Sequence, residues 1–460
     1  MKVAFVTSEA VPYAKTGGLA DVCGTLPLYL EKIGVETSII MPKYRGISAK
    51  KVMDMEIEHN GIKRISVFQD GIAYFVDYPE YFDRDGLYGT PSGDYPDNLE
   101  RFTLFAKAVI ALIRTKNFDI VHCHDWQTAL VPLYIRKYDL TSKSLFTIHN
   151  LGYQGRFPKN KFALLGIEWE YFNPEGIEFY GDINFLKAGV LYSDMITTVS
   201  PTYATEIQTP EFGFGLEGIL RKYSHKLCGI LNGIDYQVWN PETDSLIYEP
   251  YNDFKGKKKN KLELTNELLL NSKKPLIGMV SRIAGQKGFD LLTKILDDII
   301  SLNYSFVLLG FGEEYYCEKF KQFANSYPGQ VSINIKFDET LAHRIYAGSD
   351  FFLMPSKYEP CGLGQMISLR YGTVPVVHRT GGLADTVIQF NPDKMSGNGF
   401  VFENYAAQAL IDTLKSAYSV YCKEEIFTAL SQSCMKYDFS WDRSAHEYKD
   451  IYEKLFSKSS

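Results

Sequence analysis

The chain has 460 residues, with 49 Lys and Arg, 55 Asp and Glu, and a net charge of −6 at pH 7. This length exceeds what one hydrophobic core usually holds, so it predicts two domains of about 200 residues each. A composition of 45% hydrophobic and 23% charged residues excludes a disordered chain, and the negative net charge argues against nucleic acid or an anionic membrane as partner.

The cysteines and the N-terminal residues indicate the cellular compartment in which we expect the protein. The chain has seven cysteines and no CxxC pair, and scattered cysteines in an odd number are typical of a reduced cytosolic protein. The N-terminal stretch "VAFVTSEA" lacks the pattern of a signal peptide, and no uninterrupted apolar run reaches the about 18 residues that a transmembrane helix needs. We therefore expect a cytoplasmic protein.

The first half of the chain alternates predicted strands with predicted helices. Residues 2–10 predict a buried strand, 19–34 a helix that Gly34 ends, and 35–44 a second strand. Further strands are expected at 72–78, 118–125, 144–150, 194–200 and 226–233. This alternation predicts a mostly parallel sheet covered by helices.

The polar stretch 240–261 separates this half from a second alternating region, and we place the domain boundary between residues 243 and 244. The second region predicts strands at 275–282, 305–310, 331–337, 350–356 and 374–379. Helices are expected between them at 288–302, 313–325, 339–348 and 362–372. The fold class is therefore α/β, with one doubly wound, Rossmann-like sheet in 1–243 and another in 244–440.

The hexapeptide TGGLAD occurs twice, at 16–21 after Lys15 and at 380–385 after Arg379. Each copy follows a predicted strand and begins a predicted helix. A glycine-rich loop at a helix start leaves backbone N–H groups unpaired at the positive end of the helix dipole, which attracts phosphate. Two glycines could also serve a tight turn alone, but one copy per domain, each beside a cation, favours two half-sites that bind one anionic ligand in a cleft between the domains.

Two loops of the second region carry further candidates. Arg282 and Lys287 follow a strand in "SRIAGQKGFD", and two cations at that place suit a diphosphate, although a solvated turn is the alternative. Glu359 follows another strand in "PSKYEPCGLGQ", where a carboxylate can accept hydrogen bonds from sugar hydroxyls or balance a developing positive charge. The neighbouring Cys361 has no obvious base and is expected to be a packed side chain.

In the first region "IVHCHDW" could suggest a metal site. Strand alternation places His122 and His124 on one face and Cys123 and Asp125 on the other, so the four side chains do not converge, and we expect no metal. Asp125, at the end of its strand, is better placed to bind a polar ligand. The next strand ends with His149 and Asn150, which we expect at the same edge of the sheet, although a lone histidine is usually structural.

The motifs "KTGGLADV", "HCHDWQT", "TIHNLGYQG", "LNGID", "SRIAGQKG", "PSKYEPCGLGQ" and "YGTVPVVHRTGGLADTV" together resemble those of the bacterial glycogen synthases and plant starch synthases, in order and spacing as well as in letters. The resemblance spans nearly the whole chain. It implies a two-Rossmann glycosyltransferase fold called GT-B, with its two domains facing an interdomain cleft. It also implies transfer of glucose from ADP-glucose to the 4-hydroxyl of an α-1,4-glucan (glycogen or malto-oligosaccharide) with retention of configuration.

The resemblance assigns roles to residues of this chain. The donor phosphates would be bound by Lys15, Gly17 and Gly18 in the first domain and by Arg282, Lys287, Thr380, Gly381 and Gly382 in the second. The glucose would be bound by Asp125, His149, Asn150, Asn232 and Glu359. Glu359 would also be the catalytic carboxylate, Phe337 at the end of its strand would stack on the adenine, and a last helix within 441–460 would pack on the first domain.

One position departs from the wider clan of retaining enzymes, in which a second Glu follows the first by eight residues. This chain has Ile367 there, so the ribose would be recognised elsewhere. Two other functions remain open: a phosphorylase, for which no setting for a pyridoxal-phosphate lysine is recognisable, and a catalytically silent glucan-binding protein on the same scaffold. We expect no cofactor, and the intact Glu359, Arg282, Lys287 and His149 favour the enzyme.

Overall fold

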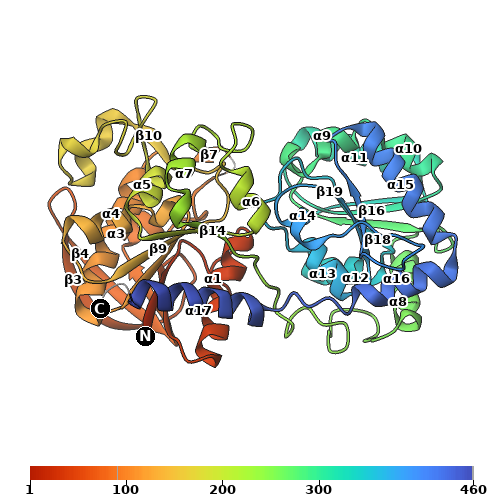
Figure 1. The fold of residues 1–460 in the computed structure, drawn as a ribbon, viewed down its shortest axis with the longest axis horizontal. Helices are drawn as coiled ribbons and strands as arrows, with labels where there is room; N and C mark the ends of the chain where they lie inside the picture. The colour runs from red at the N-terminus through yellow and green to blue at the C-terminus, as the bar shows by residue number, and fades with distance from the viewer. Residues whose placement is uncertain (91, 458–460) are drawn as a thin grey trace. The chain divides into compact units, whose positions relative to one another are not determined.

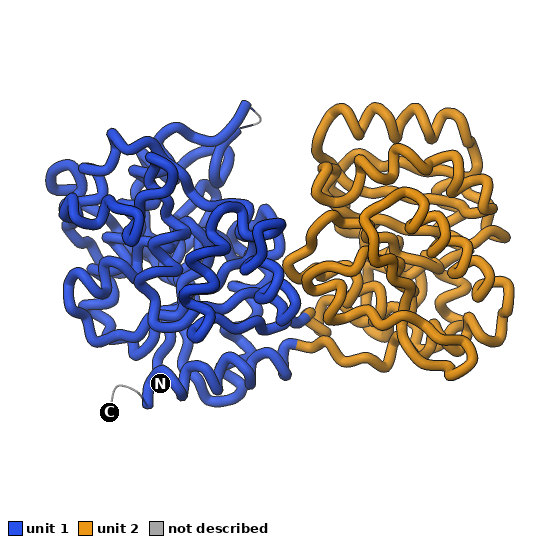
Figure 2. Tube along the Cα trace, turned by 45° about the horizontal axis from the view of Figure 1, so that its top comes forward, with its two compact units in different colours: residues 1–233, 441–460 blue, residues 234–440 orange. Residues whose placement is uncertain are grey.

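The computed structural model describes residues 1–90 and 92–457 and divides them into two compact units. The first unit contains residues 1–233 and the segment from Trp441 onward, and the second contains Ile234–Ser440 (Figure 2). The second unit thus begins earlier than residue 244, where the change in composition had suggested the boundary. The reason is visible at Trp239, whose ring stacks on His343 of the second unit with 4.0 Å between ring centroids.

A nine-stranded sheet with the order β14-β13-β9-β8-β1-β2-β5-β4-β3 forms the first unit (Figure 1). Its strands from β14 to β5 pair in parallel, whereas β3 and β4 form an antiparallel hairpin at one edge. The bounds are β1 Lys2–Val6, β2 Glu36–Pro42, β3 Lys50–Glu58, β4 Ile62–Asp70, β5 Ala73–Asp77, β8 Ile120–His124, β9 Lys143–Ile148, β13 Met195–Thr198 and β14 Leu227–Gly229. The β3–β4 hairpin was not predicted, because β3 is mostly exposed and β4 fully buries only Ile65 and Val67, so neither strand is a continuous buried apolar run.

Helices flank this sheet, and short elements fill the connections. The helices are α1 Gly18–Lys32, α2 Pro79–Phe82, α3 Asn98–Lys116, α4 Leu130–Lys137, α5 Phe185–Tyr192, α6 Pro201–Glu206, α7 Glu217–Lys222 and α17 Trp441–Ser457. Short strands are β6 Gly89–Thr90, β7 Gly93–Asp94, β10 Arg156–Pro158, β11 Glu178–Phe179 and β12 Asp182–Asn184, and single 3₁₀ turns are η1 Trp126–Thr128, η2 Lys159–Leu165, η3 Trp169–Tyr171 and η4 Ser224–Lys226.

The last helix, α17, belongs to the first unit and lies against α1 (Figure 1). Lys449 of α17 donates a hydrogen bond to the carbonyl oxygen of Ile33 at 2.9 Å, and Trp441 and Tyr452 are buried. The predicted residues 458–460 of the last helix lie outside the described residues.

The second unit is built on a six-stranded parallel sheet with the order β17-β16-β15-β18-β19-β20. Its strands are β15 Leu276–Val280, β16 Ser305–Gly310, β17 Val331–Ile335, β18 Phe351–Met354, β19 Val374–His378 and β20 Phe400–Phe402. The helices are α8 Phe254–Glu267, α9 Phe289–Leu292, α10 Leu296–Ser301, α11 Glu314–Ser326, α12 Glu339–Gly348, α13 Gly364–Arg370, α14 Gly381–Thr386, α15 Ala407–Tyr421 and α16 Glu424–Cys434, with the 3₁₀ turn η5 Gly285–Lys287. The single helix expected at 288–302 is two helices, because Ile295 leaves the helical region with φ −128°.

Both sheets carry their cores on buried apolar strands, as parallel sheets covered on two faces require. In the first unit, β1 buries Val3 to Val6 completely. In the second unit, one large apolar cluster packs β15, β16 and β18 against α9, α11, α15 and α16. Within residues 1–90 and 92–457, no helix combines the length and the apolar character that crossing a membrane requires.

Candidate active site

The first TGGLAD copy begins α1, and its glycines are exposed. Gly17 precedes the helix with φ −161°, and a Cβ added there would have no atom within 4 Å. The expectation that all the loop N–H groups are unpaired is wrong in part, because the carboxylate of Glu9 accepts a hydrogen bond from the N–H of Thr16 and is also bonded by that of Gly17. The N–H of Ala20 donates to the carbonyl oxygen of Gly17 at 3.3 Å, so the amides expected to bind a phosphate narrow to those of Gly18 and Leu19.

Glu9 is a buried carboxylate that the sequence analysis did not identify. Glu9 is 3% exposed, and its carboxylate also accepts hydrogen bonds from the hydroxyls of Thr16 at 2.9 Å and Tyr88 at 2.8 Å. Burial raises the pKa of the Glu9 carboxyl above its ordinary value, although these donors act in the opposite direction. A single carboxylate near the carboxyl end of the strand expected at 2–10 was the signal that could have revealed it.

Lys15 lies outside this network. Its ammonium group is 2.6 Å from the carboxylate of Asp21, and both side chains are partly exposed. A surface ion pair of this kind is weak, so a stronger anion could displace Asp21 at little cost.

The edge formed by the carboxyl ends of β8 and β9 brings together Asp125, His149 and Asn150. Asp125 adopts a positive φ of 57°, and its carboxylate accepts the backbone N–H of His149 at 2.7 Å. Burial raises the pKa of Asp125 to about 7 and lowers that of His149 to about 3. The side-chain oxygen of Asn150 accepts the N–H of Gly152 at 3.0 Å, which leaves the amide NH₂ end of Asn150 for a ligand.

Asn232, after β14, is 6% exposed, and its side-chain oxygen has no hydrogen-bond partner among the described residues. A buried amide oxygen without a partner is costly, and a ligand hydroxyl could satisfy it. This observation supports the expected role of Asn232 in binding a sugar.

The second TGGLAD copy is packed differently from the first. Gly381 and Gly382 are buried, and the N–H of Gly382 donates to the carbonyl oxygens of Glu359 and Pro360 at 3.1 Å each. A Cβ on Gly381 would lie 2.0 Å from the Glu359 carbonyl oxygen, and one on Gly382 would lie 2.0 Å from that of Cys361. These glycines are therefore required for close contact with the loop that carries Glu359, and Gly382 has no N–H left for a phosphate.

Glu359 is the centre of the second unit's candidate site. Its side chain is 6% exposed, and its carboxylate lies 2.8 and 2.6 Å from the ammonium nitrogen of Lys287. The hydroxyl of Ser356 donates to the same carboxylate at 2.8 Å, and the carbonyl oxygen of Ser356 contacts the ring of His378 at 2.8 Å. The chain thus holds a buried carboxylate against one cation and one hydroxyl. The sequence analysis missed Ser356, because a serine in a loop has no distinguishing pattern.

The loop of Arg282 and Lys287 packs tightly on the Glu359 loop. Gly288 has a φ of +84°, and a Cβ there would lie 2.1 Å from the carbonyl oxygen of Pro355. The N–H of Lys357 donates to the carbonyl oxygen of Gln286 at 2.9 Å. Arg282 has an exposed side chain in the same loop. The structure therefore brings Arg282, Lys287 and Glu359 to one edge of the sheet.

The remaining expectations concern the nucleotide and metals. Phe337 does not end a strand as expected, because β17 stops at Ile335 and Asp338 already caps α12. Its ring is nevertheless 79% exposed at that edge, which suits stacking. Ile367 is buried in α13. Over residues 1–90 and 92–457 no group of three His, Cys, Asp or Glu residues is arranged to hold a metal ion.

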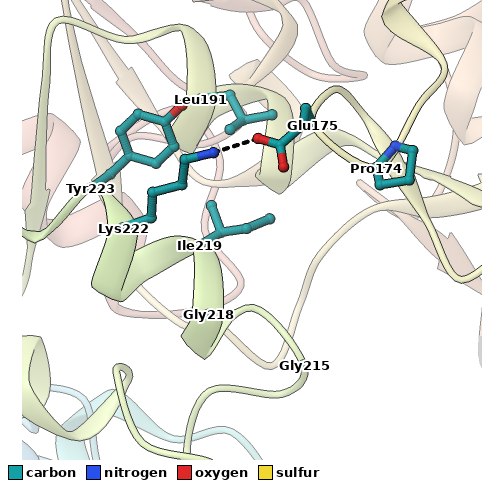
Figure 3. A pocket seen from close by; sticks show the side chains of 8 residues that line it. All are labelled: Pro174, Glu175, Leu191, Gly215, Gly218, Ile219, Lys222 and Tyr223. Carbon is teal, nitrogen blue, oxygen red and sulfur yellow. Dashed lines mark hydrogen bonds and ion pairs between the residues drawn. The ribbon is translucent and has the colours of Figure 1, made fainter.

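A cavity of about 250 Å³ lies elsewhere in the first unit (Figure 3). An ion pair joins Lys222 to Glu175 beside it. Its lining consists of Pro174, Glu175, Leu191, Gly215, Gly218, Ile219, Lys222 and Tyr223, which include none of the expected site residues.

Two family models and many known proteins match this chain. A family model described as the starch synthase catalytic domain matches residues 2–222, and one described as glycosyl transferases group 1 matches residues 260–427. The chain is 44% identical over 474 residues to a glycogen synthase of Koribacter versatilis, covering 99% of this chain and 98% of that protein. It is also 44% identical over 488 residues to a glycogen synthase of Thermotoga maritima, covering 100% and 99%.

Solved structures show the same relationship. The catalytic domain of starch synthase IV from Arabidopsis thaliana, bound to ADP and acarbose, matches with a TM-score of 0.90 and 34% identity over 99% of both chains. A sucrose-phosphate synthase from Thermosynechococcus elongatus matches with a TM-score of 0.65 at 17% identity, which shows the fold alone. The sheets, the matched families and the full-length relatives together show that this chain belongs to the glycogen synthase and starch synthase family, which are glycosyltransferases of the GT-B fold.

Proposed function

We propose that the protein transfers glucose from ADP-glucose to the non-reducing end of an α-1,4-glucan, either glycogen or a malto-oligosaccharide, with retention of configuration. The observation that carries this proposal is the likeness, over 99% of the chain, to a starch synthase catalytic domain bound to ADP and acarbose. The proposal is also supported by the arrangement of Glu359, Lys287 and Asp125 after the carboxyl ends of strands in their sheets.

In this proposal the diphosphate is bound by cationic side chains and by amides at a helix start. Arg282 and Lys287 of the second unit supply positive charge, and Lys15 with the first two amides of α1 supplies the rest. Lys287 now contacts both oxygens of Glu359, so a bound diphosphate would share this cation with the carboxylate. Lys287 would thus hold the leaving group and Glu359 in a fixed relation.

The glucose would be recognised by polar side chains. Asp125, His149, Asn150 and Asn232 would bind sugar hydroxyls, and the unpartnered oxygen of Asn232 supports this role. Glu359 would stabilise the positive charge that develops on the sugar ring as the bond to phosphate breaks. Phe337 would stack on the adenine, since its ring is exposed at the sheet edge.

The second TGGLAD copy would act on the donor indirectly. Gly381 and Gly382, which follow Thr380, pack on the backbone of the Glu359 loop, because the N–H of Gly382 donates to the carbonyl oxygens of Glu359 and Pro360 and Gly381 lies against that of Glu359. We therefore propose that their contribution to donor binding is the position of Glu359.

The proposed chemistry is a displacement on one face of the sugar. The bond between C1 and the phosphate oxygen breaks, a bond forms between C1 and the acceptor's O4, and the proton of the acceptor hydroxyl passes to the departing phosphate oxygen. Negative charge grows on the diphosphate during this step, and Arg282, Lys287 and the start of α1 would stabilise it without a metal ion or other cofactor.

The test is a comparison of ADP-glucose and UDP-glucose with glycogen as acceptor, measuring release of the nucleoside diphosphate. The proposal predicts faster turnover with ADP-glucose. Release of glucose 1-phosphate from glycogen and inorganic phosphate, without transfer from either donor, would instead identify a phosphorylase. Glycogen binding without any turnover would identify a silent binding protein.

The proposal places this reaction in the cytoplasm. All seven cysteines, which lie among the described residues, are free thiols, as in proteins of a reducing compartment.

A further inference from the structure

Three histidines of the first unit lie in contact at the ends of β8 and β9. The rings of His122 and His124 are 4.1 Å apart between centroids. The Nδ1 atom of His124 lies 3.0 Å from the Nε2 atom of His149, which is hydrogen-bond distance. His149 is a residue of the candidate active site, whereas the mechanism above gives no role to His122 or His124.

His122 is fixed on both sides of its ring. Its Nδ1 lies 2.8 Å from the hydroxyl of Tyr452 in α17, and its Nε2 lies 2.6 Å from the hydroxyl of Thr147 in β9. The ring of Phe5 stacks on His124 at 5.5 Å with an interplanar angle of 17°, and it also lies 4.9 Å from the ring of His122. His124 is therefore packed against both His122 and Phe5, with its Nδ1 at hydrogen-bond distance from His149.

Burial favours the neutral form of all three rings. Burial lowers the pKa of His122 and that of His124 well below the ordinary value for histidine, and it lowers the pKa of His149 to about 3. A neutral imidazole carries one proton, on either Nδ1 or Nε2. One proton must therefore lie between His124 Nδ1 and His149 Nε2, and the question is which ring carries it.

The surroundings of His124 decide between the two arrangements. Its Nε2 is buried and has no hydrogen-bond partner among the described residues. If His149 donated the proton, His124 would have to carry its own proton on Nε2, and a buried N–H without an acceptor is strongly disfavoured. If His124 donates from Nδ1, its buried Nε2 carries no proton, so only a lone pair is left without a partner there.

We propose that His124 is a positioning residue that fixes the tautomer of His149: His124 Nδ1–H donates to His149 Nε2, so the proton of His149 lies on Nδ1. Asp125 fixes the same residue from its backbone, since its carboxylate accepts the N–H of His149 at 2.7 Å. His149 thereby offers a hydrogen-bond donor, with a set direction, to a neutral oxygen such as a sugar hydroxyl. This inference rests on the proposed function for the identity of the ligand, but not for the tautomer.

The tautomer can be measured without any activity. In the full-length protein labelled with ¹⁵N-histidine, long-range proton–nitrogen spectra distinguish an Nδ1–H ring from an Nε2–H ring. The signals of His149 are assigned by their loss in His149→Gln. We expect His149 to be the Nδ1–H tautomer in the wild type, and finding the Nε2–H tautomer there would overturn the proposal.

Two substitutions at His124 then separate donation from packing. The amide nitrogen of His124→Asn can take the place of Nδ1 and donate to His149, whereas His124→Leu fills similar space without a donor. We expect His149 to remain Nδ1–H in His124→Asn and to take up the Nε2 proton in His124→Leu. The kcat/KM for glucosyl transfer should fall by about tenfold or more in His124→Leu and stay within about threefold of the wild type in His124→Asn.

A matched control is His59→Asn. His59 is also fully buried with both ring nitrogens unpartnered, but it lies in the turn between β3 and β4, at the far edge of the sheet from β9. The variant His59→Asn should be less stable than the wild type but should leave the His149 signals unchanged. Equal losses of activity in both His124 variants with unchanged His149 signals would overturn the proposal. If His124→Leu does not fold, the spectra of the wild type and of His124→Asn still show which nitrogen of His149 carries the proton. A wild type without transferase activity would refute the proposed function but would leave the tautomer result intact.

Discussion

Replacing Glu359 by Gln should abolish turnover while leaving the fold nearly intact. The carboxylate is 6% exposed and accepts hydrogen bonds from Lys287 at 2.6 and 2.8 Å and from Ser356 at 2.8 Å. Gln keeps the shape and one acceptor oxygen, so one charged hydrogen bond, worth about 1.5–3 kcal/mol, is lost. Part of this loss is offset, because a buried charge no longer has to be desolvated.

We therefore expect a loss of unfolding free energy of about 1 kcal/mol, which lowers the Tm of a domain of this size by about 2–4 °C. The rate should suffer far more. Removing a preorganised charge beside the reacting centre typically costs about 100- to 1,000-fold in turnover, or about 3–4 kcal/mol of transition-state stabilisation.

Three measurements test this prediction: kcat with ADP-glucose and glycogen, the Kd of ADP by calorimetry, and the Tm. The expected result is a collapse of kcat with an almost unchanged Kd. A control is Glu267→Gln, which removes a partly exposed ion pair with Arg344 at 2.7 Å and should leave kcat unchanged. If kcat in Glu359→Gln stays within about tenfold, or if ADP affinity falls as much as kcat, the catalytic role is refuted.

Three further predictions follow from the same contacts. Arg282→Ala and Lys287→Ala should each lower kcat by about 100- to 1,000-fold, and wild-type activity should persist in EDTA. Near-normal kcat in both variants, together with a wild type that EDTA inactivates and magnesium restores, would contradict the leaving-group role. The pKa of Asp125 is raised to about 7 in the folded chain, whereas its value in the unfolded chain is about 3.9. Between these two pH values the folded chain keeps a proton on Asp125 that the unfolded chain has lost. The contribution of Asp125 to stability therefore falls as the pH rises through this window. Denaturant unfolding at pH 5 and pH 8 should therefore show Asp125→Asn gaining stability relative to the wild type at the higher pH, and a pH-independent difference would contradict the raised pKa. Gly382→Ala should lower the Tm and the activity, because its Cβ would lie 2.0 Å from the Cys361 carbonyl oxygen. Gly17→Ala should keep the Tm, because its Cβ would have no atom within 4 Å. Equal Tm values of the two variants in thermal denaturation would contradict the packing argument.

Much of the fold could be predicted because parallel strands in a covered sheet are continuous apolar runs. Residues 305–310 and 374–378 are such runs and became β16 and β19. The β3–β4 hairpin could not be predicted in this way, because β3 is mostly exposed and the buried residues of β4, Ile65 and Val67, do not form a continuous run. Trp239 shows why the boundary moved: what assigns a residue to a unit is its packing partner, here His343, which is distant in sequence.

The candidate site could be predicted only as far as local patterns reach. Strand ends and glycine-rich loops indicated Asp125, His149, Arg282, Lys287 and Glu359. Identical letters did not imply identical roles, however, because the glycines at 17 and 18 are exposed while those at 381 and 382 are buried against the Glu359 loop. The contacts of Glu9 with Tyr88 and of His122 with Tyr452 join residues distant in sequence, which no local pattern reveals.

The most direct test of the proposed function is the stereochemistry of its product. Proton NMR of a malto-oligosaccharide incubated with ADP-glucose, in the presence of EDTA, follows the new anomeric signal as it forms. The account predicts a new α-1,4-linked glucose that appears in step with ADP. A β-linked product, or hydrolysis of ADP-glucose without any new linkage, would contradict it.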